Sequence, residues 1–101
     1  MGSKSKLTDL LEKLKSAVDR GSLRFSKHTF ERMSERGILR REVRFVLKNG
    51  FHEKRKDQFD EEYNCWNYSI RGKTLDDRKL RIVVSFEKPN FIVVTAIDLE
   101  R

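Results

Sequence analysis

The chain has 101 residues, of which 37% are hydrophobic and 39% charged, and its formal net charge is +7. This length suits one small domain, and the aromatic content of 10% favours a folded chain over a disordered one. A membrane span and a secretory signal are not expected, because no apolar run approaches about 18 residues and no signal-like segment opens the chain. A single cysteine, Cys65, cannot form an internal disulfide, which predicts a reducing, cytoplasmic location.

Helical periodicity starts near the N-terminus and predicts a first amphipathic helix within residues 1–23. Its apolar positions follow a spacing of three and four, as shown by Leu7, Leu10, Leu11, Leu14, Ala17 and Val18. Ser5 or Thr8 can cap its start, and Gly21 lies where it should stop. Met1-Gly2-Ser3 is typical of an expression tag and is left out of the fold reasoning. We expect residues 24–101 to form a single α+β domain.

Two further helices are expected before residue 50. Ser26 is a good N-cap and Gly37 a good left-handed stop, so the spacing predicts a helix over 27–36. A third helix is predicted over 40–48 and should end at the Asn-Gly pair before residue 51. Its boundary is less well defined, because Leu39 has no side-chain group that can cap a helix.

After Gly50 the periodicity changes from helix to strand. Residues 51–58 predict a charged edge strand, and residues 63–71 and 80–86 alternate between apolar and polar positions. Residues 91–97, "FIVVTAI", are apolar on both faces, which is typical of a central strand. The predicted fold is therefore α+β, with three N-terminal helices packed on a four-stranded, mainly antiparallel sheet.

The positive charge is concentrated in the first half of the chain. Residues 1–50 hold 13 Lys and Arg against 6 Asp and Glu, whereas residues 51–101 hold 10 of each. A one-sided basic region predicts an anionic partner, which can be RNA, DNA or an acidic protein segment. The alternative is a surface that serves solubility, and the charge alone does not separate the two interpretations.

The predicted helix at 27–36 carries the strongest candidate site. His28, Arg32 and Arg36 recur at steps of four, and Lys27 lies beside the histidine in the first turn. An imidazole can transfer a proton, while guanidinium groups and a helix N-terminus can hold a phosphate. The alternative is a solvated helix face on which glutamates pair with the arginines, and such faces are common. Spacing alone favours this second interpretation.

Other candidates lie on the predicted strands. Arg71 and Arg81 fall on the face opposite the tryptophan and are candidates for binding an RNA backbone. Tyr63 and Tyr68 are candidates for stacking on bases, although Tyr68 shares the tryptophan's face, which favours a core position with a solvated hydroxyl. The two histidines and one cysteine are too scattered for a zinc site, and we expect neither a metal nor another cofactor.

Several stretches resemble a widespread bacterial family, domain of unknown function 4258. They are "HTFERMSERGI", "VRFVLKNG", "YSIRGK", "DRKLRIVVSF" and "IVVTAI", and together they span roughly residues 25–98. The most specific is the His-x-x-x-Arg-Met-x-x-Arg-Gly-Ile string from His28 to Ile38. The sequence departs from the family at Leu39-Arg40, where members usually have a small polar cap. The N-terminal helix lies outside the resemblance.

The order of helices before an antiparallel sheet is also similar to small RelE-, MqsR- and BrnT-like ribonuclease toxins, with a barnase-like arrangement. This second resemblance implies a metal-independent endoribonuclease that acts by 2′-hydroxyl attack and is neutralised by an antitoxin-like partner. His28 would be the general base or acid, and Arg32 and Arg36 would stabilise the phosphate.

Two alternatives without catalysis stay open. One is a basic module that only binds nucleic acid, using the same arginines. The other is a protein-interaction domain that docks an acidic partner or forms a homodimer through the leucine-faced first helix.

Overall fold

Three α-helices and six strands make up residues 5–100, the part of the chain that the computed structural model describes. The tag-like Met1-Gly2-Ser3 lies outside the described residues. In chain order the elements are α1 Leu10–Arg20, β1 Leu23–Phe25, α2 Lys27–Glu35, α3 Arg40–Asn49, β2 Phe51–His52, a 3₁₀ turn η1 Lys54–Lys56, β3 Gln58–Asp60, β4 Cys65–Lys73, β5 Lys79–Glu87 and β6 Asn90–Asp98. No helix in this part is long and apolar enough to cross a membrane.

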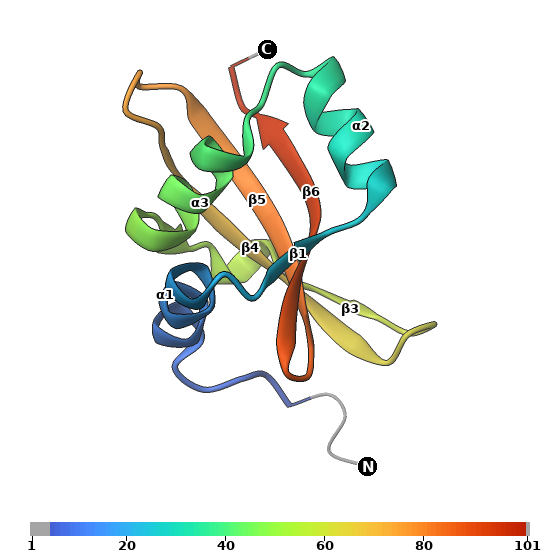
Figure 1. The fold of residues 1–101 in the computed structure, drawn as a ribbon. Coiled ribbons are helices and arrows are strands. Elements are labelled where there is room, and N and C mark those ends of the chain that lie inside the picture. The colour runs from blue at the N-terminus through green and yellow to red at the C-terminus, as the bar shows by residue number, and fades with distance from the viewer. Residues whose placement is uncertain (1–4, 101) are drawn as a thin grey trace.

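The strands form one mixed sheet in the order β1-β6-β5-β4-β2, with β3 also paired to β4 (Figure 1). The pairs between β4, β5 and β6 are antiparallel, as are those of β2 and β3 with β4. The β1 strand runs parallel to β6, with Leu23 opposite Phe91. The α+β class and the three helices are therefore confirmed.

The predicted four-stranded sheet is wrong in strand count and arrangement. Residues 51–58 do not form one edge strand, because η1 interrupts them and leaves one short strand on each side, β2 before it and β3 after it. The β1 strand, three residues between two helices, was also not predicted. So short a strand has little periodicity of its own, and its pairing with β6 joins residues far apart in the sequence.

The hydrophobic core lies between one face of the sheet and the α1 and α3 helices. The largest fully buried side chains come from both layers and include Leu14, Leu47, Ile70, Ile82 and Phe91. Figure 1 shows α1 and α3 beside each other on this face and α2 apart from them, near β6. On the opposite face, most side chains of β4, β5 and β6 are half-buried or exposed.

The ends of α1 partly match the predicted signals. The helix stops before Gly21, whose φ of 72° provides the left-handed C-cap. Neither Ser5 nor Thr8 caps its start: the N-cap is Asp9, and its side chain makes no capping hydrogen bond. The α1 helix nevertheless belongs to the same core as the rest of the chain, because Leu14 is fully buried in it.

A glutamate compensates for the poor cap at the start of α3. The Glu42 carboxylate accepts a hydrogen bond from the Leu39 backbone N–H, with a distance of 3.0 Å. This is one half of a capping box, and it explains why the helix begins at Arg40 as predicted.

Gly50 allows the end of α3 to approach β4 closely. A Cβ atom at this position would lie 2.5 Å from the Arg71 carbonyl oxygen and 2.7 Å from that of Val46. Both neighbours are backbone atoms that cannot rotate away. We therefore expect Gly50→Ala to lower the free energy of unfolding by about 2 kcal/mol through overpacking. Urea unfolding measures this loss, and an unchanged midpoint would contradict the close approach.

Candidate functional site

The α2 helix carries the candidate histidine, and local signals define both of its ends. The Ser26 hydroxyl accepts a hydrogen bond from the Thr29 backbone N–H at 3.0 Å, as expected of an N-cap. At the other end, Gly37 has a φ of 66°, and the Ile38 N–H donates to the Met33 carbonyl. No acidic residue lies in the first turn, so no carboxylate there offsets the positive end of the helix dipole.

His28, Arg32 and Lys27 are exposed on α2. His28 lies in the first turn, and Arg32 follows one turn later, so the two side chains are neighbours on the helix surface. Lys27 adds a second cation next to the histidine. The helix therefore brings His28 and Arg32 together on one solvent-facing surface, and Lys27 is exposed in the same first turn as His28.

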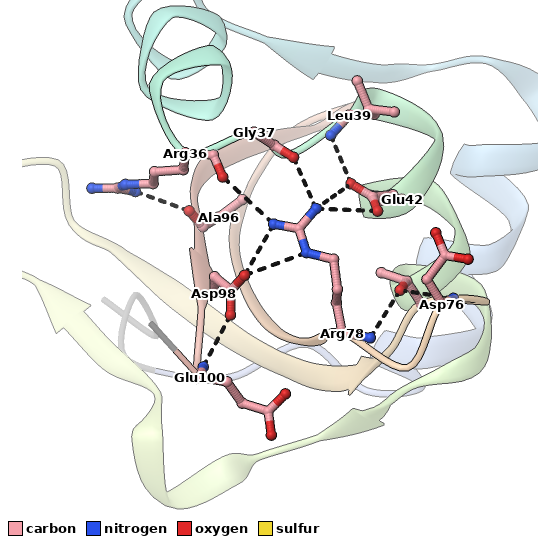
Figure 2. A network of polar contacts seen from close by, with 10 residues as sticks. Arg36, Gly37, Leu39, Glu42, Asp76, Arg78, Ala96, Asp98 and Glu100 are labelled. Carbon is pink, nitrogen blue, oxygen red and sulfur yellow. Dashed lines mark hydrogen bonds and ion pairs between the residues drawn. The ribbon is translucent and has the colours of Figure 1, made fainter.

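Arg36 lies at the other end of α2 and is held against the sheet. One guanidinium nitrogen donates to the Ala96 carbonyl at 2.9 Å (Figure 2). The same nitrogen donates to the Thr95 hydroxyl at 3.3 Å. Its side chain borders a separate hollow beside Ile97. Because eight residues of helix span about 12 Å, Arg36 is well separated from His28. Its contacts fix α2 along the edge of β6.

Thr29 makes the matching contact at the start of the helix. Its buried hydroxyl lies 3.1 Å from the Val93 carbonyl and 3.3 Å from that of Val94. Together Thr29 and Arg36 attach both ends of α2 to β6, beyond the point where β1 stops pairing. This attachment sets the position of His28 relative to the sheet.

His28 lines a hollow of about 500 Å³ on the sheet face that α1 and α3 leave uncovered; we call it the sheet-face hollow. One wall is the first turn of α2, and the other is the turn between β3 and β4. The side chains between the walls come from β4, β5 and β6. The complete lining is Ser26, His28, Thr29, Asp60, Tyr63, Cys65, Asn67, Ser85, Glu87, Ile92, Val93 and Val94.

Strand register explains why these side chains meet. Asn67 on β4 lies opposite Ser85 on β5, which in turn lies opposite Ile92 on β6. Side chains at successive alternate positions point to one face, so Cys65 and Glu87 follow Asn67 and Ser85 on the same side. A row across three strands thus forms the floor of the hollow.

Cys65 is the one nucleophilic thiol of the chain, and its environment makes it unreactive. Burial raises the pKa of the Cys65 thiol, and the negative charges of Asp60 and Glu87 raise it further. The thiol therefore stays protonated near neutral pH, whereas a nucleophile must be a thiolate. This environment favours a structural role for Cys65 over a nucleophilic one.

Arg71 and Arg81 lie side by side on the same sheet face, farther along the strands. They are opposite each other in the β4–β5 register, and both bind the carboxylate of Glu53, at 3.3 Å and 2.9 Å respectively. The hydrogen bond from Arg81 has the largest effect on Glu53 and lowers its pKa, and the hydrogen bond from Arg71 lowers it further. Burial alone would raise this pKa, but the two arginines hold it below its usual range. The buried Glu53 therefore orients two guanidinium groups that remain partly exposed.

Tyr68 cannot stack on an RNA base in this structure. Its side chain is buried on the helix-covered face, and its hydroxyl accepts a hydrogen bond from the Leu7 backbone N–H at 2.8 Å. His52 packs against one side of the ring. The candidate role of Tyr68 in RNA binding is therefore wrong, because no ring face is open. Tyr63, which is 72% exposed in the sheet-face hollow, has the required access.

A comparison with protein families identifies the relationship of this chain. The model of a domain of unknown function, DUF4258, matches residues 25–98, from the end of β1 to the end of β6. The chain belongs to the DUF4258 family. A search of the curated proteins found no match.

The DUF4258 match includes α2 and the whole sheet-face hollow, and it leaves out α1. In this DUF4258 domain, Glu53 and Glu87 were not among the residues predicted from the sequence. Glu53 stood in a charged segment with no visible partner, and its two arginines lie 18 and 28 residues away. Strand alternation could have placed Glu87 on the face of Ser85, but the register with β4 could not be obtained from one sequence.

No group of three or more His, Cys, Asp or Glu residues in the described part of the chain is arranged to hold a metal ion. The chemistry that the DUF4258 site offers is proton transfer by an imidazole, together with anion binding by guanidinium groups and the backbone N–H groups at the start of α2.

Proposed function

We propose that this DUF4258 protein is a metal-independent endoribonuclease of the toxin-like kind. The observation that carries the proposal is the position of His28, exposed at the N-terminus of α2 and on the wall of a hollow, with Arg32 on the next turn. A proton-transfer group and an anion-binding group are thereby adjacent. The order of elements in the sequence, which resembles that of RelE-like toxins, adds support by analogy.

In the proposed reaction the ribose 2′-oxygen attacks the adjacent phosphorus, and the bond from phosphorus to the 5′-oxygen breaks. His28 accepts the proton of the 2′-hydroxyl or donates one to the leaving 5′-oxygen, and solvent exchanges the other proton. The products are a 2′,3′-cyclic phosphate and a 5′-hydroxyl, so the step consumes no water and needs no oxidant or reductant. An imidazole suits this role because it changes its charge within the physiological pH range.

The start of α2 supplies the electrostatic part. Arg32 and Lys27 are cations beside His28, and the first-turn N–H groups point towards an anion placed before the helix. Negative charge grows on the phosphate oxygens as the 2′-oxygen attacks. Fixed donors at this place stabilise the transition state more than the ground state. Arg36 acts indirectly, by holding α2 on β6.

Arg71 and Arg81 would bind the RNA backbone away from the cleavage point. Arg71 is four residues along β4 from Asn67 in the hollow, which corresponds to about 13 Å. Two guanidinium groups at that distance can contact phosphates of nearby nucleotides. The same partly exposed cations would attract an acidic antitoxin-like protein, which would compete with RNA for this face.

The test is cleavage of a 5′-labelled RNA by the purified protein in EDTA. We expect products that end in a cyclic phosphate, which acid converts to a mixture of 2′- and 3′-phosphates. Intact RNA in the presence and absence of ribosomes would contradict the proposal. Salt-sensitive RNA binding without cleavage would then indicate that Arg71 and Arg81 belong to a module that binds RNA but does not cleave it.

A further inference from the structure

We propose that the sheet-face hollow is a base-binding subsite selective for guanine, with Glu87 as the residue that determines specificity; this inference rests on the proposed ribonuclease function. It identifies the substrate as single-stranded RNA with a guanine next to the cleaved phosphate. Three properties of the hollow favour guanine: its charge, the aromatic ring on its wall, and the hydrogen-bonding capacity of its carboxylate.

The charge of the hollow excludes a phosphate and suits a neutral base. Its lining includes the carboxylates of Asp60 and Glu87 but no lysine or arginine, although the chain as a whole has a net charge of +7. The cations lie outside it, at Lys27 and Arg32 on α2. A nucleotide can therefore place its phosphate at the helix and its base in the hollow, with His28 at the boundary between them.

The walls and floor offer the contacts that a base requires. Tyr63 is 72% exposed, which leaves its ring available for stacking on a base. Ile92 and Val94 contribute apolar surface on the β6 side. The volume of about 500 Å³ lies within the range of small-molecule sites and accommodates a purine.

The two carboxylates have different roles. One oxygen of Asp60 accepts hydrogen bonds from the backbone N–H groups of Glu62 and Tyr63, at 2.9 and 3.1 Å. Asp60 thus fixes the turn that carries the tyrosine ring. Within residues 5–100, the carboxylate of Glu87 has no hydrogen-bond or ion-pair partner, so both of its oxygens are available to a ligand.

Guanine is the base that a free carboxylate binds best. It presents two adjacent donors, N1–H and the N2 amino group, which match the two oxygens of a carboxylate. Adenine and cytosine each present one amino donor beside an acceptor nitrogen, and uracil presents one N–H between two carbonyl oxygens. An acceptor facing Glu87 would be repelled. Asn67 and Ser85 on the floor can donate to the O6 and N7 acceptors of guanine.

The experiment titrates the full-length protein with guanosine 3′-monophosphate and with the adenosine, cytidine and uridine analogues. Amide chemical shifts in ¹H–¹⁵N spectra report the binding. We expect the guanosine nucleotide to bind at least tenfold more tightly than the others and to shift the amides of Asn67, Ser85 and Tyr63. Equal affinities for the four nucleotides, or no shift at millimolar concentration, would overturn the subsite.

The variant Glu87→Gln tests the residue assigned to specificity. It replaces one acceptor oxygen by a donor, so we expect the guanosine preference to fall at least tenfold while the spectrum otherwise stays native. The matched control is Glu62→Gln, which removes the same charge from the neighbouring turn but does not line the hollow. This control should keep the preference. If both variants lost the guanosine preference, the preference would depend on the overall charge near the hollow, and the role of Glu87 would be overturned.

Cleavage mapping separates this inference from the function on which it rests. Guanosine binding without RNA cleavage would overturn the proposed ribonuclease function but support the guanine site. Cleavage next to all four nucleotides would support the ribonuclease function but overturn the guanine selectivity.

Discussion

Replacing His28 by alanine should reduce RNA cleavage by about a hundredfold or more, the usual contribution of a general acid or base. The urea midpoint of unfolding should stay unchanged, because the imidazole is exposed and the helix cap belongs to Ser26. Single-turnover cleavage of labelled RNA measures the first effect. The RNA affinity of the variant should remain close to that of the wild type, since Arg32 and Lys27 keep their charges.

The second histidine provides the matched control. His52 is half-buried, and its ring nitrogen lies 2.7 Å from the fully buried carboxylate of Asp57. His52→Asn should therefore lower stability but keep the cleavage rate of the folded fraction. If His28→Ala cleaved RNA at the wild-type rate, the assignment of His28 as the proton-transfer residue would be wrong. Loss of folding in His28→Ala would show a structural role instead.

The helices were predictable because their signals are local. Ser26 and Gly37 define α2 within one residue of the predicted range, and the Asn-Gly pair ends α3 as expected. The start of α1 was not predictable from caps, since Asp9 takes a left-handed conformation without a side-chain hydrogen bond. Its first turn is held by packing of Leu10 in the core, which depends on distant residues.

The sheet was less predictable because strand pairing joins residues far apart in the sequence. Alternation identified β4 and β5, and the apolar character of residues 91–97 correctly indicated that β6 is an interior strand. The three-residue β1 is stable only because β6 pairs with it. The interruption between β2 and β3 at η1 accompanies the inward turn of Glu53 towards Arg71 and Arg81. No local sequence pattern predicts this contact.

The candidate site shows the same division. Periodicity placed His28 and Arg32 on one exposed surface, since i and i+4 neighbours are fixed by helix geometry. It also grouped Arg36 with them, but that guanidinium binds the Ala96 carbonyl of β6. Glu87 came into the site only through the register of three strands. Residues that share a helix face can be found from sequence, whereas those assembled across strands cannot.

Replacing Arg78 by methionine should lower the free energy of unfolding by about 3 kcal/mol, because two largely buried carboxylates would lose their common partner. Arg78 joins three segments: its guanidinium donates to Asp98 at 3.0 Å, to Glu42 at 3.0 Å and to the Gly37 carbonyl at 2.8 Å (Figure 2). The hydrogen bond to Asp98, together with the charge of Glu42, raises the pKa of Arg78, so the cation persists throughout the practical pH range.

The effect should reach the candidate site through α2. Arg78 binds the carbonyl of Gly37, which terminates α2, and the Glu42 carboxylate that caps α3, so its loss loosens the junction between the two helices. Hydrogen exchange should therefore rise at the C-terminal turn of α2 before the core is affected.

Arg55→Met, at an exposed position of η1, is the matched control and should change stability by less than about 0.5 kcal/mol. Adding Glu42→Gln to Arg78→Met should restore part of the lost stability, because it removes the Glu42 charge that Arg78 had balanced. An equal loss with and without Glu42→Gln would show that packing of the arginine stem, and not its charge, holds the junction.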